Sequence, residues 1–177
     1  RKKQPDPRET LQLFEDHLSK ERLKFIMAID PGVNGAFAFL TTQQYAVVNI
    51  PTLERKVGNK KRQAFDFAEI WQTLEPFLAS PLKRNLSVII EKAAPNAGGG
   101  KKDTASTAFM VGVGGWMYEL LFESLKVTRD YVVPRSWKSK MQLLSKDKED
   151  SRVKAQTLFP KAPLWRKEDH NRAEALL

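Results

Sequence analysis

The stretch FIMAIDPGVNGAFAFL (Phe25–Leu40) decides the fold of this 177-residue chain. Its apolar first part predicts a buried strand that ends in an acid, Asp30. Proline, glycine and asparagine at positions 31–35 predict a turn, and AFAFL predicts a second strand that returns beside the first. The segment Tyr45–Ile50 follows as a third strand, so this part of the chain is predicted to be an antiparallel meander.

Outward from this stretch, strands and helices alternate. LSVIIE (Leu86–Glu91) repeats the first pattern, a buried strand that ends in a carboxylate. Apolar residues at helical spacing predict helices near residues 67–78 and 109–121, and residues 130–134 predict a further strand. Ser145 is a candidate N-cap for a third helix that continues through about Leu158. This order predicts an α/β fold with a mixed sheet, the antiparallel strands coming first.

Three segments are predicted to lie outside this pattern. Residues 1–23 are interpreted as a basic arm and an appended amphipathic helix, and residues 24–177 as the domain itself. Residues 53–63 are predicted to be a flexible basic loop, and residues 93–106 a second, glycine-containing loop. A stripe of small residues on the long helix predicts close approach of another backbone: Ala105, Ala108, Gly112 and Gly115.

The composition is that of a globular protein, with 41% hydrophobic and 29% charged residues. No apolar run is long enough for a membrane span, and the absence of cysteine excludes disulfides, thiolate zinc sites and a cysteine nucleophile. The net charge of +9 predicts a polyanionic partner such as nucleic acid, with an idle basic surface as the alternative. The candidate DNA-binding residues are Lys60, Lys61, Arg62, Lys101, Lys102, Arg135, Lys138 and Lys140.

Acidic residues predict a metal site. Asp30 and Glu91 each end a buried strand, and parallel neighbours would bring both to one edge of the sheet. Asp169 is predicted to come just before the terminal helix and Glu174 in its first turns, so that both face the same edge. Oxygen ligands suit Mg²⁺ or Mn²⁺, and two such ions serve phosphodiester hydrolysis. The alternative is that each acid is a strand cap or an ion-pair partner.

Five segments resemble motifs of the RuvC-like Holliday-junction resolvases, most closely those of plant chloroplasts, over about residues 24–177. They are IDPGVNGAFAF, VIIEKAAP, VPRSWKSKM, SKDKEDSRVKAQTLFP and KEDHNRAEALL. The resemblance implies an RNase H-like (RuvC-type) mixed five-stranded sheet flanked by helices. It also implies a homodimeric crossover junction endodeoxyribonuclease that binds four-way junction DNA and nicks two opposed strands symmetrically.

The resemblance further implies two Mg²⁺ ions per active site, with Mn²⁺ able to substitute, and neither a small-molecule cofactor nor a membrane partner. It places the protein in the chloroplast nucleoid, and we expect the transit peptide to be absent from this chain. The implied metal-binding and catalytic acids are Asp30, Glu91, Asp169 and Glu174. The bacterial pattern would put Asn171, rather than Asp169, at the third position.

Two further residues are candidates for the active site, and one feature of the bacterial enzymes has no counterpart at the matching position. Lys146 is a candidate catalytic residue that contacts phosphate, with a solvated lysine as the alternative. His170 is a candidate for orienting water or carrying a proton, or it is a surface histidine. The bacterial enzymes place an aromatic wedge soon after the second acid, but residues 92–108 contain none. Residues 98–103 or Phe109 would have to take that role.

Two other functions share part of this pattern. Another RNase H-like nuclease, acting on RNA–DNA hybrids or in a transposase, would need the same acids but leaves the late motifs unexplained. A catalytically silent module that binds branched DNA would not need the intact acids.

Overall fold

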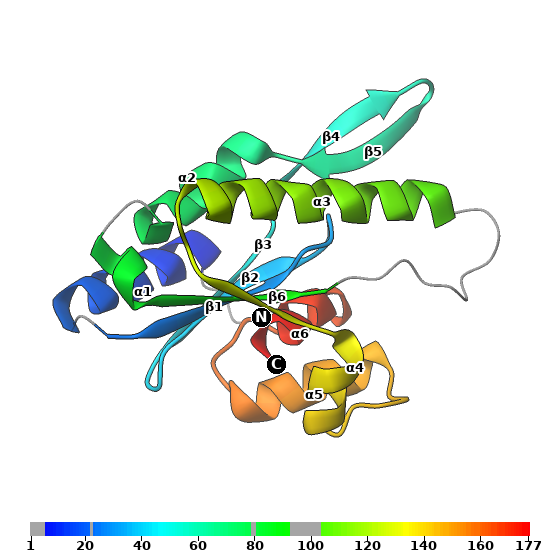
Figure 1. The fold of residues 1–177 in the computed structure, drawn as a ribbon. Coiled ribbons are helices and arrows are strands. Elements are labelled where there is room, and N and C mark those ends of the chain that lie inside the picture. Colours follow the sequence, from blue (N-terminus) through cyan, green and yellow to red (C-terminus); the bar gives the residue numbers. More distant parts are fainter. Residues whose placement is uncertain (1–5, 22, 79–80, 93–103) are drawn as a thin grey trace.

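The computed structural model describes residues 6–21, 23–78, 81–92 and 104–177 (Figure 1). The main sheet contains β1 (Phe25–Asp30), β2 (Ala36–Leu40), β3 (Tyr45–Asn49), β6 (Leu86–Glu91) and β7 (Arg129–Val132). A second, two-stranded sheet contains β4 (Thr52–Val57) and β5 (Lys60–Phe65). The helices are α1 (Pro7–Glu21), α2 (Phe67–Leu78), α3 (Thr104–Ser124), α4 (Pro134–Lys140), α5 (Lys148–Leu158) and α6 (His170–Leu176). Short 3₁₀ turns lie at η1 (Pro81–Asn85) and η2 (Lys167–Asp169).

The main sheet has the strand order β3-β2-β1-β6-β7. Strand β2 runs antiparallel to both of its neighbours, whereas β1, β6 and β7 run parallel to one another. Parallel neighbours need a long crossover, and α2 and α3 occupy the two crossovers β3-to-β6 and β6-to-β7. The predicted α/β fold, a mixed five-stranded sheet flanked by helices, is confirmed.

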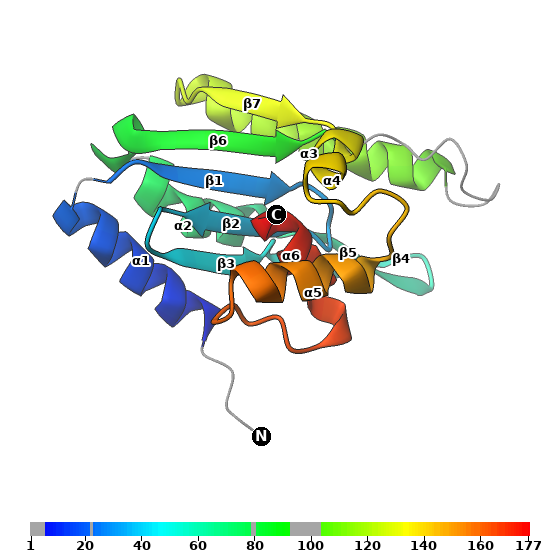
Figure 2. The ribbon, with the colours of Figure 1, turned by 90° about the horizontal axis from the view of Figure 1, so that it is seen from below.

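Helices cover both faces of the sheet (Figures 1 and 2). Alternate residues of β1 point to opposite faces. Phe25, Met27 and Ile29 join the larger core cluster with residues of α1, α2 and α3. Ala28 packs against the smaller cluster on the other face, formed with α5 and α6. Asp30 lies two residues after Ala28 and therefore on the same face of the strand, so its side chain points to the side of the sheet that carries α4 and α6.

The N-terminal helix predicted from the sequence is present as α1, and its apolar side belongs to the main core. Phe14 and Leu18 are buried, and the Phe14 ring lies 6.3 Å from that of Phe25 and 6.2 Å from that of Phe39. The helix therefore packs on the sheet beside β3 rather than standing apart from it. A domain boundary between residues 23 and 24 stays a prediction.

The segment predicted to be a flexible basic loop is instead a β-hairpin. Strands β4 and β5 pair antiparallel with Val57 opposite Lys60, and Gly58 takes a positive φ of 61° in the two-residue turn. The alternating apolar pattern of a strand is missing because most described side chains of this hairpin are exposed, so neither face requires apolar residues. The glycine–asparagine turn was the available signal.

Helix α3 approaches the sheet closely at Gly114. A Cβ atom there would lie 3.0 Å from the Pro31 carbonyl oxygen and 3.3 Å from the Phe65 ring. By contrast, Cβ atoms at Gly112 and Gly115 would meet nothing within 4 Å. Within the subunit these two glycines therefore contact no other backbone, and the predicted packing of the small-residue stripe on another backbone stays a prediction for a contact between subunits. The side chains of Ala105 and Ala108 lie outside the described residues. None of the helices described is long and apolar enough to span a bilayer.

Candidate functional site

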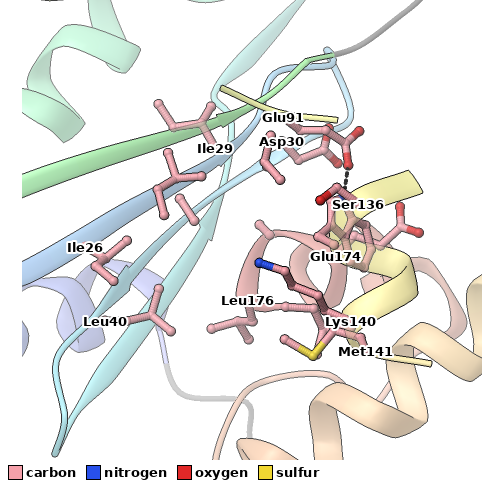
Figure 3. A pocket seen from close by; sticks show the side chains of 16 residues that line it. Ile26, Ile29, Asp30, Leu40, Glu91, Ser136, Lys140, Met141, Glu174 and Leu176 are labelled. Atoms are coloured by element: carbon pink, nitrogen blue, oxygen red, sulfur yellow. Dashed lines mark hydrogen bonds between the residues drawn. The ribbon is translucent and has the colours of Figure 1, made fainter. Parts of the chain in front are cut away.

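Three carboxylates line one cavity of about 310 Å³ between the sheet and helices α4 and α6 (Figure 3). Asp30 ends β1, Glu91 ends β6, and Glu174 lies in α6. The two strands are parallel neighbours with Ile29 opposite Ile90, so their terminal acids lie side by side. The structure thus brings together three of the four predicted acids, at the edge of the sheet that the sequence indicated. Their metal-binding role stays a prediction.

The turn after β1 positions the first acid. The backbone N–H of Gly32 donates to Oδ1 of Asp30 at 3.4 Å, and that of Gly35 donates to the Gly32 carbonyl oxygen at 2.8 Å. Any side chain at Gly35 would collide with the carbonyl oxygen of Asp30. The sequence Asp-Pro-Gly-Val-Asn-Gly therefore needs its last glycine for a close backbone approach.

Helix α4 positions the other two acids. The indole N–H of Trp137 donates to Oε2 of Glu91 at 2.6 Å. The next residue, Lys138, pairs with Glu174 at 3.0 Å, and its ammonium lies 5.1 Å from the centre of the Trp137 ring. Trp137 belongs to the WKSK segment, but the sequence does not show which acid an indole will reach. Trp137 is therefore a site residue that the sequence alone did not predict.

The carboxylates share a buried site in which nearby lysine charges only partly offset their mutual repulsion. Burial, reinforced by the negative charge of Glu91, raises the pKa of Asp30 from 3.8 to about 6. Burial also raises the pKa of Glu91, although the hydrogen bond from Trp137 acts in the opposite direction. The charge of Glu174 adds to the upward shift of both pKa values. A cation between these groups would relieve the repulsion.

The donor set suits a hard divalent ion. As placed, no three acidic or histidine side chains of the described residues lie close enough together to ligate one ion. The chemistry nevertheless fits, because Asp30, Glu91 and Glu174 offer only oxygen atoms, which Mg²⁺ and Mn²⁺ prefer. Glu174 would have to exchange Lys138 for the ion. These three residues are therefore the candidates for holding the metal.

Asp169 does not join them. Its carboxylate accepts the backbone N–H of Arg166 at 2.8 Å and a guanidinium N–H of the same residue at 3.0 Å, and it lies 3.7 Å from the guanidinium of Arg172. Asp169 and Arg172 are 2% and 6% exposed, so the buried guanidinium needs this counter-charge. The prediction that Asp169 and Glu174 both face the sheet edge is wrong for Asp169. Its predicted alternative, Asn171, lines a separate polar cavity.

Of the two lysines in the segment SKDKE, Lys148 rather than Lys146 interacts electrostatically with Asp30 and Glu91. The charge of Lys148 lowers the pKa of both Asp30 and Glu91, partly offsetting the effect of burial. Its Nζ lies 3.1 Å from Nε2 of His170, whose Nδ1 lies 3.0 Å from the carbonyl oxygen of Lys167. Lys146 is exposed and precedes α5, and no ion pair joins it to another described residue. Which lysine of SKDKE faces the site depends on where α5 begins.

The helix start is fixed by its cap. The Asp147 side chain accepts the backbone N–H groups of Glu149 and Asp150, which makes Lys148 the first residue of α5. Asp147 and Asp150 form a capping box, a pattern that can be recognised in the sequence and that favours Lys148 over Lys146.

The predicted DNA-binding residues fall into three groups. Lys60, Lys61 and Arg62 lie on β5, and Lys61 pairs with Glu54 across the hairpin at 2.8 Å. The second group, on α4, is Arg135, Lys138 and Lys140. Arg135 is exposed, whereas Lys140 lines the carboxylate cavity. Lys101 and Lys102 lie outside the described residues, as does the whole segment 98–103. Residues 104–106, predicted to belong to the same loop, are the first residues of α3.

An apolar surface lies on the exposed side of α3 and on Phe67. Trp116 is 71% exposed, Leu120 63% and Phe67 50%. They border a groove that also includes Gly112, Val113 and Met117. We call this set the α3 surface. Large exposed apolar patches mark interaction sites.

No protein-family model matches the chain, and no curated protein matches it. Among solved structures, the chain is similar to T. thermophilus RuvC in complex with a Holliday junction substrate. The two share 12% sequence identity over 87% of this chain and 90% of that chain, with a TM-score of 0.44.

Proposed function

We propose that this chain is a metal-dependent endonuclease that resolves four-way DNA junctions by symmetric nicking of two strands. The observation that carries the proposal is the meeting of Asp30, Glu91 and Glu174 at one cavity, with Lys138 and Lys148 beside them. Clustered carboxylates flanked by lysines suit the hydrolysis of a phosphodiester. The choice of a junction as substrate rests on the sequence resemblance.

In this proposal Asp30, Glu91 and Glu174 hold Mg²⁺, with Mn²⁺ able to replace it. Two such ions, when bound, would activate the attacking water and stabilise the leaving oxygen. Trp137 fixes the orientation of Glu91 through its indole N–H. Lys148 neutralises phosphate charge next to Asp30. Asp169 is assigned to support α6 as the counter-ion of Arg172.

We propose that a second copy of the chain covers the α3 surface. Two opposed strands must be cut at one junction, so two equivalent active sites related by a two-fold axis suit the substrate. Trp116 and Leu120 supply apolar area for such a contact, and the bare backbone at Gly112 leaves room for a partner helix.

The hairpin is proposed to contact duplex arms. Its side chains at Lys61 and Arg62 are exposed on a ribbon that projects from the body of the molecule (Figure 1). Phosphate contacts of this kind add affinity without reading sequence. Residues 98–103, or Phe109, are proposed to act at the junction centre. On the sequence resemblance we also propose the chloroplast nucleoid as the location.

A nicking assay tests the proposal. A four-way junction, a duplex and an RNA–DNA hybrid of matched length are each incubated with and without Mg²⁺, using Asp30→Asn as the inactive variant and Asp130→Asn, an exposed acid on β7, as its control. We expect symmetric nicks in the junction alone, only with Mg²⁺, and none with Asp30→Asn despite retained binding. Preferential cutting of the hybrid would favour a ribonuclease. Binding without cutting would favour a silent module.

A further inference from the structure

A second cavity, of about 460 Å³, is lined in part by Lys148, the lysine whose charge acts on Asp30 and Glu91. It lies where the turn after β1, the start of β4, the start of α5 and the η2–α6 segment meet. The polar and charged residues considered as ligand contacts in its lining are Asn34, Thr52, Lys148, Glu168, His170 and Asn171. We call it the polar cavity. Its volume is within the range of small-molecule sites, about 300–1,000 Å³.

Polar groups in this cavity are free to bind a ligand. Within the described part of the chain, the amides of Asn34 and Asn171 and the hydroxyl of Thr52 make no hydrogen bond. Side-chain amides both donate and accept, and a hydroxyl does the same. The cavity therefore presents donors and acceptors together with one cation, Lys148, and one anion, Glu168.

Lys148 links the polar cavity to the carboxylates. It lines the cavity and contacts His170 at 3.1 Å. Its charge also acts on Asp30 and Glu91, which border the first cavity. Asn34 belongs to the turn that follows directly from Asp30. Lys148 and this turn therefore both bring the polar cavity near the carboxylates.

We propose that the polar cavity is a subsite for the deoxynucleotide next to the scissile phosphodiester. Lys148 contacts its phosphate, and Asn34, Asn171 and Thr52 hydrogen-bond to its sugar and base. Glu168 directs the phosphate toward the Lys148 side, because like charges repel, and it can accept from an exocyclic base amine. This inference rests on the proposed nuclease function, since it assumes that the strand passes the acids.

The test is direct binding of the four 5′-deoxynucleoside monophosphates to the whole chain without divalent ions, measured by NMR titration. Asn34→Asp introduces a carboxylate into the cavity. Gln43→Glu makes the same change of charge in the exposed β2–β3 turn, at the opposite end of those strands. We expect the dissociation constant to rise about tenfold with Asn34→Asp and less than about twofold with Gln43→Glu, because exposed charges beyond about 10 Å are screened. Thr52→Val, which keeps the shape and removes the hydroxyl, should weaken binding about threefold.

The outcomes separate this inference from the proposed function. Equal weakening by Asn34→Asp and Gln43→Glu, or no binding by the parent chain, would overturn the subsite, even if junctions are nicked normally. Binding that Asn34→Asp abolishes, in a chain that nicks no junction, would keep the polar cavity as a nucleotide-binding site and refute the nuclease. Thermal unfolding of each variant confirms that the fold is retained.

Discussion

The indole N–H of Trp137 lies 2.6 Å from Oε2 of Glu91 and holds the second strand-end acid from the opposite side of the cavity. Strand β6 brings the carboxylate to the edge of the sheet, and α4 then selects one orientation for it. Trp137 is buried, so this donor does not exchange freely with water.

Loss of the Trp137 N–H donor should weaken the binding of Mg²⁺ at the proposed metal site. Trp137→Phe keeps an aromatic ring and removes the N–H, so one hydrogen bond to a charged group, worth about 1.5–3 kcal/mol, disappears. We expect the Mg²⁺ concentration for half-maximal nicking to rise about tenfold. Trp165→Phe is the matched control, because that tryptophan is half-exposed and lies outside the carboxylate cavity. An equal response of both variants would show that the indole N–H has no specific role.

The raised pKa of Asp30, about 6 against an ordinary 3.8, predicts a pH-dependent stability in the absence of divalent ions. The folded chain binds this proton more tightly than the unfolded chain does, so stability falls as pH rises from about 4 to about 6 and stays lower above. Each pH unit in that window costs about 1.4 kcal/mol, for a total of about 3 kcal/mol. Asp30→Asn should lack this loss, as urea unfolding at pH 4.5, 5.5 and 7 would show. The same pH dependence in parent and variant would contradict the assignment.

Asp169 and Glu174 should respond differently to loss of charge. Asp169→Asn weakens a buried ion pair with Arg172, so we expect a loss of about 3 kcal/mol in unfolding free energy. Glu174→Gln breaks a partly exposed pair with Lys138, worth under about 1 kcal/mol, but should abolish nicking. Calorimetry of both variants measures the change in stability, and single-turnover cleavage measures the change in nicking rate. If Asp169→Asn unfolds normally and does not cut, Asp169 is a metal ligand after all.

Substitutions at two glycines of α3 should have different effects, one on dimer formation and the other on the stability of the subunit. Gly112→Leu adds a side chain into open space, so the subunit should keep its stability while sedimentation shows monomers that nick poorly. Gly114→Leu drives the same side chain against Pro31 and Phe65 and should destabilise the subunit by about 2 kcal/mol or more. An unchanged dimer with Gly112→Leu would exclude the α3 surface as the contact.

The hairpin should contribute affinity without selectivity. Replacing Lys60, Lys61 and Arg62 by alanine should weaken junction and duplex binding in parallel, and each lost phosphate contact should lower the salt slope by about one. Glu54→Gln should have the opposite effect, because it releases Lys61 from its partner. Binding curves from about 50 to 200 mM salt provide the measurement. A selective loss of junction binding would instead place the hairpin at the junction centre.

The sequence predicted those features that depend on local pattern. Buried strands that end in Asp30 and Glu91 can be recognised from hydrophobic runs, and the parallel pairing then follows from the order of elements. The ion pair of Asp169 with Arg172 could not be predicted, because it depends on tertiary packing. Arg172 becomes buried only when α6 packs on the sheet, where its guanidinium donates a hydrogen bond to Asn49. Neither the Trp137 contact nor the polar cavity is encoded in spacing along the chain. The hairpin lacked the alternating apolar pattern of a strand because a ribbon exposed to solvent needs no apolar face, and only its glycine–asparagine turn indicated it.

The position of Glu174 on the last helix has a consequence for biosynthesis. Helix α6 docks on β1 and β2 through small side chains, with Ala173 and Ala175 in one cluster with Ala36 and Ala38. A nascent chain, or a proteolytic fragment, that stops before α6 therefore carries two of the three acids together with the hairpin and the α3 surface. Under the proposed function, such a fragment could not complete a cutting centre. Nicking would therefore be confined to chains that are synthesised and folded through their last helix.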